Sequence, residues 1–225
     1  MVSFKGAHFP KDMILVCVRW YVAYPLSSRP VEELMQERGG SVDHATINRW
    51  VLKYSPQLEA AFHRRKRPVW VSWRMDATDI RVKGQWHYLY RAVDKNGPTI
   101  DFLLTEPRDE PAATCFLTKA IRRHGEPETI TIDGSEANAA AIRGYNAEHG
   151  TAIIIRQVKY LNSRVEQDHR AVKRVTRPML GFKAFAATQC TLAGVERMHM
   201  LRKGQLEGGA EQGLTPAAQV YSLAA

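Results

Sequence analysis

Three acidic residues stand at points of the chain where their side chains could meet. Asp76 and Asp133 each follow directly on an apolar, β-rich run, and Glu166 opens a basic helical stretch. Each acid alone would be interpreted as a solvated surface group. Carboxylates that converge from separate elements can instead hold hard divalent cations, and two Mg²⁺ ions held in this way can cleave and rejoin phosphodiesters.

The charge of the chain favours an anionic partner. The 225 residues carry a formal net charge of +9 at pH 7, with a pI near 9.6. The excess is clustered: residues 157–203 hold ten Lys or Arg against three Asp or Glu, and residues 1–68 hold eleven against six. Charge alone would also fit a merely basic soluble protein. Clustered positive charge beside candidate phosphodiester chemistry makes double-stranded DNA the expected partner.

Length and composition predict a cytoplasmic protein with one sizeable domain and a small appendage. At 44% hydrophobic residues the chain can build a core. The three cysteines are far apart and form no Cys-x-x-Cys pair, which argues against a disulfide framework and against a zinc site. The most apolar N-terminal run, residues 13–18, is far too short to span a bilayer, and no signal-peptide cleavage site follows it.

Apolar spacing predicts helices over residues 11–24, 28–39 and 44–51, with Ser28 and Asp43 as candidate N-caps. A helix, a short Gly turn and a second helix form a helix-turn-helix, whose second helix would enter a major groove. An ordinary helical hairpin has the same pattern. The side chains expected to pack inward are Ile47, Trp50 and Val51. The side chains expected at DNA are Thr46, Asn48 and Arg49, together with the basic linker residues Arg64, Arg65, Lys66 and Arg67.

From residue 69 the pattern changes to strands and then to strands alternating with helices. The expected strands cover residues 69–75, 86–93, 99–104, 128–132 and 152–155, and the expected helices cover 111–124, 135–149, 163–174 and 185–203. A mixed five-stranded sheet that begins with a hairpin and is flanked by helices is the α/β order of ribonuclease H-like folds. The Gly-, Ala- and Gln-rich residues 206–225 are predicted to be loosely ordered.

This order would bring the three acids together. The first and fourth strands are neighbours, with Asp76 in or at the end of the first and Asp133 at the carboxyl end of the fourth, where ligands of α/β sheets bind. Glu166 would reach toward both from the helix after the fifth strand. The side chains that share its helical face and would grip a phosphate are His169, Arg170 and Lys173.

Four other acids are expected to lie outside this constellation. Asp79 comes three residues after the first acid and would therefore point to the opposite face of its strand. Asp168 comes two residues after the third acid, so it would turn roughly 200° away on a helix. Asp94 and Asp101 lie in the predicted hairpin and are expected to be structural or exposed.

Several stretches together carry a family resemblance, among them Arg19-Trp20-Tyr21, VDHATINRWV over 42–51, YLYRAVD over 88–94, KYLN over 159–162, VEQDHR over 165–170 and LGFK over 180–183. From about residue 9 to residue 205 the chain resembles bacterial insertion-sequence transposases of the DDE class, specifically the IS-six-type group. The resemblance implies a DNA-cutting and strand-transfer enzyme that depends on Mg²⁺, with Mn²⁺ as a possible substitute, and that acts on element ends and target DNA as a homo-oligomer.

The resemblance also implies roles for individual residues. The catalytic and metal-holding triad of the group matches Asp76, Asp133 and Glu166, and its basic residue seven positions after the glutamate matches Lys173. Further DNA contacts are expected within the matching stretch that contains Lys159 and Asn162. The expected domains are 1–67 for binding terminal inverted repeats, 68–205 for catalysis, and a tail over 206–225.

Three features depart from the group. Ala77 and Asp79 stand where the group usually has Glu and an aromatic residue, and Gly134 stands where it often has Lys. The 32 residues between the second and third acids are slightly fewer than usual. Two alternatives therefore stay open: a decayed copy that acts as a DNA-binding protein, and a structure-specific nuclease or resolvase with the same core fold.

Overall fold

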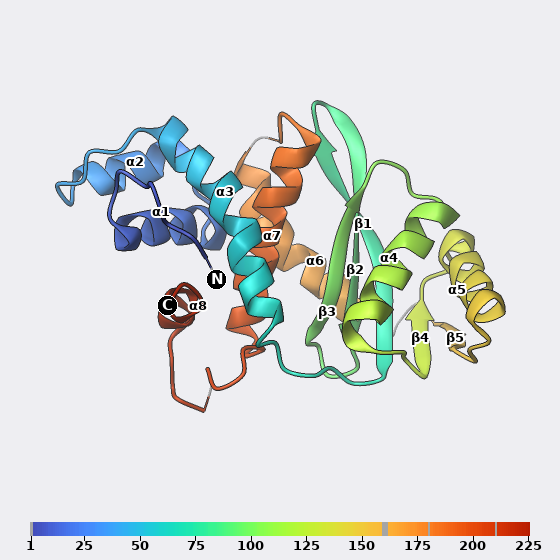
Figure 1. Cartoon of the computed structure of the whole chain (residues 1–225). Coiled ribbons are helices and arrows are strands. Elements are labelled where there is room, and N and C mark those ends of the chain that lie inside the picture. Colours follow the sequence, from blue (N-terminus) through green and yellow to red (C-terminus); the bar gives the residue numbers. More distant parts are fainter. Residues whose placement is uncertain (1, 159–161, 180, 210) are drawn as a thin grey trace. The chain divides into compact units, whose positions relative to one another are not determined.

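A long β-hairpin forms the middle of the sheet in the computed structural model, which describes residues 2–158, 162–179, 181–209 and 211–225 (Figure 1). Strand β1 (Ser72–Val82) pairs antiparallel with β2 (Gln85–Asp94) from Trp73 to Val82. Lys83 and Gly84 connect them with positive φ angles of 49° and 79°. Two left-handed residues give a turn whose twist matches that of the strands. Strand β1 is therefore longer than the apolar run 69–75 predicted, and Asp76 lies inside it.

Three further strands complete one mixed sheet. Strand β3 (Thr99–Thr105) pairs antiparallel with β2, while β4 (Thr129–Ile132) pairs parallel with β1, and β5 (Ile154–Gln157) pairs parallel with β4. The resulting order is β3-β2-β1-β4-β5. This order confirms the predicted ribonuclease H-like sheet, in which the first and fourth strands are neighbours.

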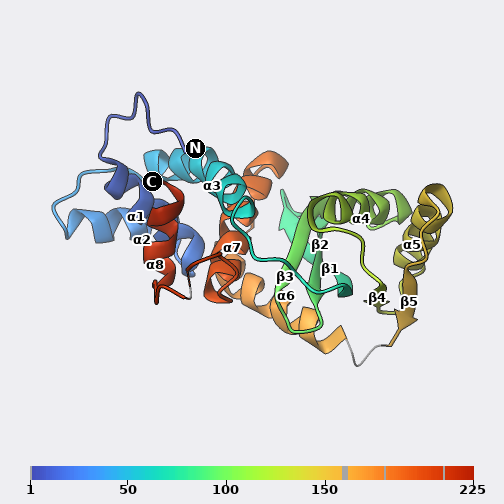
Figure 2. The ribbon, with the colours of Figure 1, turned by 60° about the horizontal axis from the view of Figure 1, so that its bottom comes forward.

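Helices cover the two faces of the sheet. Helix α4 (Glu110–His124) and helix α5 (Glu136–His149) pack on one face, where their apolar side chains form a core with alternate residues of the strands (Figures 1 and 2). The first turns of α6 (Ser163–Thr176) lie on the other face, where Asp168 accepts a hydrogen bond from the fully buried Arg91 of β2 at 3.1 Å. That ion pair, together with the buried Val165, orients the start of α6 on the sheet.

A second buried acid joins the sheet to α4. Asp101 on β3 is fully buried, with Lys119 Nζ 2.8 Å and an Arg123 nitrogen 3.3 Å from its carboxylate oxygens. Burial by itself would raise the pKa of Asp101, but the two cations and the Phe102 N–H lower that pKa below its ordinary value. Asp94 is also buried and accepts N–H bonds from the turn that follows it. Both acids are structural, as predicted.

The chain divides into two compact units, and the sheet unit covers residues 68–170. The other unit joins 1–67 to 171–225 and is helical. Its helices are α1 (Lys11–Ala23), α2 (Ser28–Gln36), α3 (His44–His63), α7 (Phe185–Arg202) and α8 (Pro216–Leu223), with a short 3-10 turn at Arg177–Met179. The predicted catalytic segment 68–205 therefore spans both units, and its separation from a DNA-binding domain stays a prediction.

Helix α3 is longer than the sequence predicted. It was expected to end near residue 51, yet it continues to His63 through Pro56 because Leu58 and Phe62 extend its buried apolar face. Helix α7 packs closely against α1 and α3 at Gly194. A Cβ at that glycine would lie 2.6 Å from Val22 Cγ1.

The described residues of the segment 206–225 are more ordered than their composition predicted. Helix α8 occupies 216–223, Leu206 and Val220 are fully buried, and Lys11 Nζ donates to the Ala224 carbonyl at 2.6 Å. The supposed linker around Lys66 forms a β-bridge with Leu206. The apolar side chains that pack here are widely spaced among small residues, so the sequence shows no helical or strand periodicity that would have predicted this packing. Among the described residues, no helix is long and apolar enough to cross a membrane.

The buried Asp101 cluster gives a stability prediction. Asp101→Asn leaves Lys119 and Arg123 without their counter-ion, so the free energy of unfolding at pH 7 should fall by about 3 kcal/mol. Because the pKa of Asp101 is lowered in the folded state, its contribution is present above the unfolded pKa and is lost as pH falls through the folded value. Urea unfolding should therefore separate the variant from the wild type at neutral pH and bring them together in acid.

The exposed Asp79 on β1 provides the control for this experiment. Asp79→Asn should change the free energy of unfolding by no more than about 0.5 kcal/mol. An Asp101 variant as stable as the Asp79 variant at pH 7 would contradict the structural role of the cluster.

Candidate active site

The three predicted acids line one cavity of the sheet unit. Asp76, Asp133 and Glu166 come from β1, from the residue after β4 and from the first turn of α6, and the cavity volume is about 520 Å³. The strand register explains the first two positions. Arg74 is the partner of Thr131 in the parallel β1–β4 pair. Asp76 and Asp133 each come two residues later, so they are neighbours just beyond the last paired residues of β1 and β4. The remaining lining residues are Arg108, Gly134, Ser135 and Asn162.

Asp76 is held on both sides of its carboxylate. Its Oδ1 accepts the N–H of Ala77 at 2.7 Å, and its Oδ2 lies 3.3 Å from Nε2 of His169. The His169 imidazole comes three residues after Glu166 on α6 and is buried against the sheet. The sequence predicted a DNA contact for this histidine. That role stays a prediction, and the structure places the imidazole beside the first acid.

Asp133 lies at the turn into α5. Its Oδ1 accepts the N–H of Ser135 at 3.1 Å, and Ser135 in turn caps α5 by accepting the N–H of Asn138. The side chain is partly exposed and faces the cavity. Gly134 between them is open: a Cβ added there would meet no atom within 4 Å.

The sequence did not identify Arg108 as a site residue. An Arg108 terminal nitrogen lies 3.4 Å from Asp133 Oδ2 and 3.6 Å from Asp76 Oδ1, so the guanidinium stands between the two carboxylates. Arg108 follows β3, which runs parallel to β1 because both are antiparallel to β2. Its loop must therefore start at the edge of the sheet where the acids lie, and that topology is the signal that could have found it.

The loop that carries Arg108 is anchored at its end. The Asp109 side chain caps α4 by accepting the N–H of Ala112 at 2.9 Å. Burial raises the pKa of Tyr90 to about 12, so its hydroxyl stays protonated and donates to the Asp109 carbonyl at 3.4 Å. The backbone beside Arg108 is thus fixed while its side chain remains one-third exposed.

Two other predictions for this region have clear outcomes. Asp168 pairs with Arg91 and also accepts from the Thr99 hydroxyl at 3.3 Å, which confirms that it turns away from Glu166. Asp79 is exposed and, by alternation along β1, points to the face opposite Asp76.

Asn162 lines the cavity and is buried, and its side-chain oxygen and nitrogen have no hydrogen-bond partner among the described residues. Such an amide is available to a ligand in the cavity. Lys159, the other residue predicted from the same stretch, lies outside the described residues. Arg170 is exposed on α6, and Lys173 further along the same helix is partly buried.

The three carboxylates are of the type that binds magnesium, but their side chains are not arranged around a common metal position in this structure. Among the residues described, no three His, Cys, Asp or Glu side chains lie close enough to hold a metal ion. The Arg108 guanidinium lies between two of the three carboxylates. Carboxylate oxygens are the ligands that hard divalent cations prefer, so the donor set suits such an ion, but these side chains would have to move closer together to bind it.

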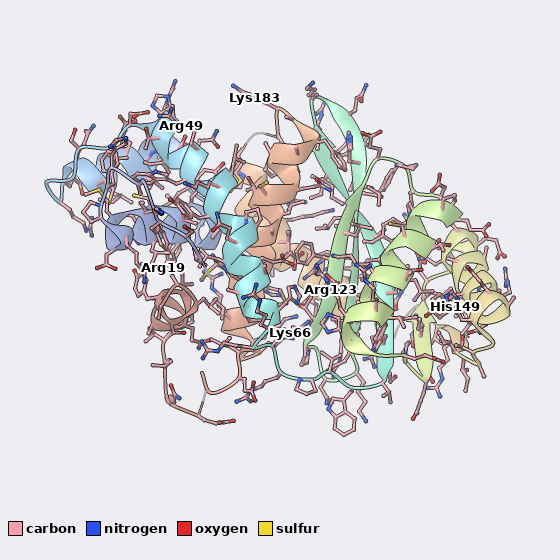
Figure 3. The ribbon with its side chains drawn as sticks, viewed as in Figure 1. Arg19, Arg49, Lys66, Arg123, His149 and Lys183 are labelled. Carbon is pink, nitrogen blue, oxygen red and sulfur yellow. The ribbon has the colours of Figure 1, made fainter. Side chains whose placement is uncertain are left out.

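The residues predicted to contact DNA through α3 lie as expected on that helix. Ile47, Trp50 and Val51 are buried, which confirms the predicted inward face, and Asn48 and Arg49 are exposed. Asp43 caps α3 as predicted. The Arg49 side chain projects from the surface of the helix and donates to the Thr46 hydroxyl at 2.7 Å (Figure 3).

The basic cluster after α3 is only partly available. Arg64 and Arg65 are exposed, but Arg67 pairs with Glu211 at 2.8 Å and the Lys66 backbone is bridged to Leu206.

Comparisons with known proteins agree on one family. Residues 70–205 match the family model of a DDE domain. The chain is 34% identical, over the full length of both proteins, to the transposase for the insertion sequence-like element IS431mec of Staphylococcus aureus and to the transposase for insertion sequence element IS257 in transposon Tn4003 of the same species. The HTLV-2 integrase catalytic core domain in complex with magnesium superposes with a TM-score of 0.47 at 15% identity, over 60% of this chain and 88% of that one. A likeness at that score supports no inference of its own.

The open space at Gly134 gives a prediction. Gly134→Lys should fold with a free energy of unfolding within about 0.5 kcal/mol of the wild type. The added cation beside Asp133 should tighten binding to duplex DNA by a few-fold at low salt, as measured by fluorescence anisotropy.

Gly194→Ala is the matched control for that substitution, because its Cβ would overlap Val22 and should cost about 1–3 kcal/mol. Equal losses of stability for the two glycine variants would contradict the geometry of the Asp133 turn.

Proposed function

The chain belongs to the DDE transposases of the IS431/IS257 type, the IS6 family of polynucleotidyl transferases, and we propose that it cuts the ends of its own insertion sequence and joins them to target DNA through Asp76, Asp133 and Glu166. One observation carries the proposal. Three carboxylates from three separate elements line a single cavity beside a basic side chain.

The carboxylates would hold divalent cations, Mg²⁺ or Mn²⁺ and two in number. Such ions, when bound, stabilise charge on the attacking and leaving oxygens of an in-line displacement. The chain's own residues prepare the site for them. His169 lies 3.3 Å from Asp76 and would orient its carboxylate, and the Asp133 carboxylate accepts the Ser135 N–H. The Arg91–Asp168 pair sets the rotation of α6 that points Glu166 into the cavity.

The proposed reaction needs no covalent intermediate with the protein. Water attacks the phosphorus at the element's end, the P–O3′ bond breaks, and the element keeps a free 3′-hydroxyl. That hydroxyl then attacks a target phosphodiester, forming a new P–O3′ bond and releasing the target 3′-oxygen. Arg108 and the unpartnered amide of Asn162 are placed to hold the phosphate oxygens during these steps.

Recognition of the terminal inverted repeats is assigned to α2 and α3. The exposed face of α3 with Thr46, Asn48 and Arg49 would enter a major groove, and Arg64 and Arg65 would contact phosphates. Since two element ends must be cut and joined together, we propose that the protein acts as a homo-oligomer with one active site for each end.

The central experiment is a strand-transfer assay on labelled element ends with Mg²⁺ or Mn²⁺. Asp76→Asn, Asp133→Asn and Glu166→Gln should each abolish joined products, at least about 1,000-fold below wild type, because each removes a charge that holds the metal. Asp79→Asn is the matched control on the same strand as Asp76, and it should keep wild-type activity because its side chain faces away.

Three outcomes of that assay discriminate the alternatives. Joined products that survive all three substitutions would overturn the assignment of the site. Binding of the ends without any cleavage by the wild type would indicate a decayed copy that acts as a DNA-binding protein. Cleavage confined to branched DNA, without joining, would indicate a structure-specific nuclease.

A separate prediction tests the proposed recognition helix. Arg49→Ala should weaken binding to a terminal-repeat duplex roughly ten-fold and weaken binding to a scrambled duplex less, if the guanidinium reads bases. Binding should be followed by fluorescence anisotropy at several salt concentrations, and the wild-type affinity should fall steeply with salt as counterions are released.

Arg122→Ala, an exposed arginine of α4 in the sheet unit, provides the matched charge control. If Arg49→Ala and Arg122→Ala lose affinity for the terminal-repeat duplex equally, Arg49 contributes only its net charge and does not read bases.

A further inference from the structure

Arg108 makes an unusual contact for an arginine beside two carboxylates. Its distances to Asp76 and Asp133, 3.6 and 3.4 Å, are longer than the roughly 2.7–2.9 Å of a tight charge-assisted hydrogen bond. Two buried pairs of the same unit are shorter: Lys119 lies 2.8 Å from Asp101, and Arg91 lies 3.1 Å from Asp168. One guanidinium is therefore shared loosely between two acids.

The reason for the shared contact is the charge of the cavity. Asp76 and Asp133 are set side by side by the strand register, and Glu166 lines the same space. Like charges this close repel unless a cation lies between them. A guanidinium stays protonated at any relevant pH, so in the metal-free protein Arg108 supplies that cation.

The same geometry allows Arg108 to leave. Its side chain is 34% exposed, whereas the Arg91 side chain that anchors α6 is fully buried. The neighbouring backbone is fixed by the α4 cap at Asp109 and by Tyr90, so only side-chain rotation is needed. A rotated guanidinium would remain at the cavity wall, with five N–H donors for the oxygens of a phosphate.

We propose that Arg108 is a resident counter-ion of the carboxylates that competes with the divalent cation and, once displaced by it, becomes a ligand of the DNA phosphate. This inference rests on the proposed function, because it takes Asp76 and Asp133 as the metal-binding pair. In this proposal the Arg108 side chain has two positions. It lies between the carboxylates before the metal enters, and it contacts the DNA phosphate afterwards. Metal affinity in the absence of DNA is then held below what the three carboxylates alone would give.

The test measures MgCl₂ binding to the full chain by calorimetry in the absence of DNA. Arg108→Ala should bind Mg²⁺ roughly five-fold or more tightly than wild type, because a competing cation coupled to the site is gone. Arg108→Lys keeps a charge but loses the planar fork that spans two carboxylates, and should lie between the two. Arg122→Ala should match the wild type.

A second readout does not depend on the calorimeter or on activity. In EDTA the thermal midpoint of Arg108→Ala should be lower than that of wild type, since two neighbouring carboxylates have lost their counter-ion, and Mg²⁺ should raise it by more than it raises the wild type. Binding of a terminal-repeat duplex in the presence of Mg²⁺ should at the same time be weaker in Arg108→Ala than in Arg122→Ala.

The controls keep two failures apart. If the wild type shows no Mg²⁺ heat that Asp133→Asn removes, the proposed metal site is wrong. If the wild type shows such heat but Arg108→Ala binds Mg²⁺ with unchanged or weaker affinity, only the competition proposed for Arg108 is overturned. Unchanged DNA binding by Arg108→Ala in Mg²⁺ would overturn its role as a phosphate ligand.

Discussion

The parallel pairing of β1 with β4 is the constraint on which the site depends. A register that matches Arg74 with Thr131 places Asp76 and Asp133 next to each other, and no other pairing of these strands would do so. Two adjacent carboxylates cost free energy in a folded protein unless positive charge is supplied. The surrounding structure can be understood as the means of supplying that charge: Arg108 between the acids and, in the proposed function, a divalent cation.

The third acid depends on a different interaction. Helix α6 is polar and basic apart from a stripe of buried valines, Val165, Val172 and Val175. The buried pair of Arg91 and Asp168 adds a polar constraint to that stripe, because a fully buried guanidinium requires its partner. Once Asp168 faces β2, the helical period turns Glu166 toward the cavity and brings His169 under it toward Asp76. A structural ion pair thus positions two residues of the candidate site.

The predictable part of this molecule is the part that is local in sequence. The apolar runs before Asp76 and Asp133 and the alternation of strands with helices led directly to the sheet order, and residue spacing separated Asp168 from Glu166. What sequence reasoning missed depends on contacts between distant segments. Arg108 lies in a loop with no motif, and its importance follows only from where β3 ends.

The helical unit shows the same limit. Its core joins residues 1–67 to residues 171–225, and no local pattern announces that association. The sequence predicted that α3 ends near residue 51, yet the buried Leu58 and Phe62 continue its apolar face to His63. Tertiary packing set the length of that helix, as it set the structure of the C-terminal tail, where α8 forms among small residues.

The departures from the family pattern bear on whether the copy has decayed, and their positions decide how much they matter. Ala77 is buried in the core on the face of β1 opposite Asp76, and Asp79 is exposed on that same opposite face. Neither side chain therefore adds charge to the cavity. Gly134 does border the cavity. A glycine in place of the family's lysine leaves open space there, and Arg108 already supplies a cation 3.4 Å from Asp133. A chain under no constraint would have no reason to keep three acids and their positioning partners together, so the intact cavity favours a working enzyme.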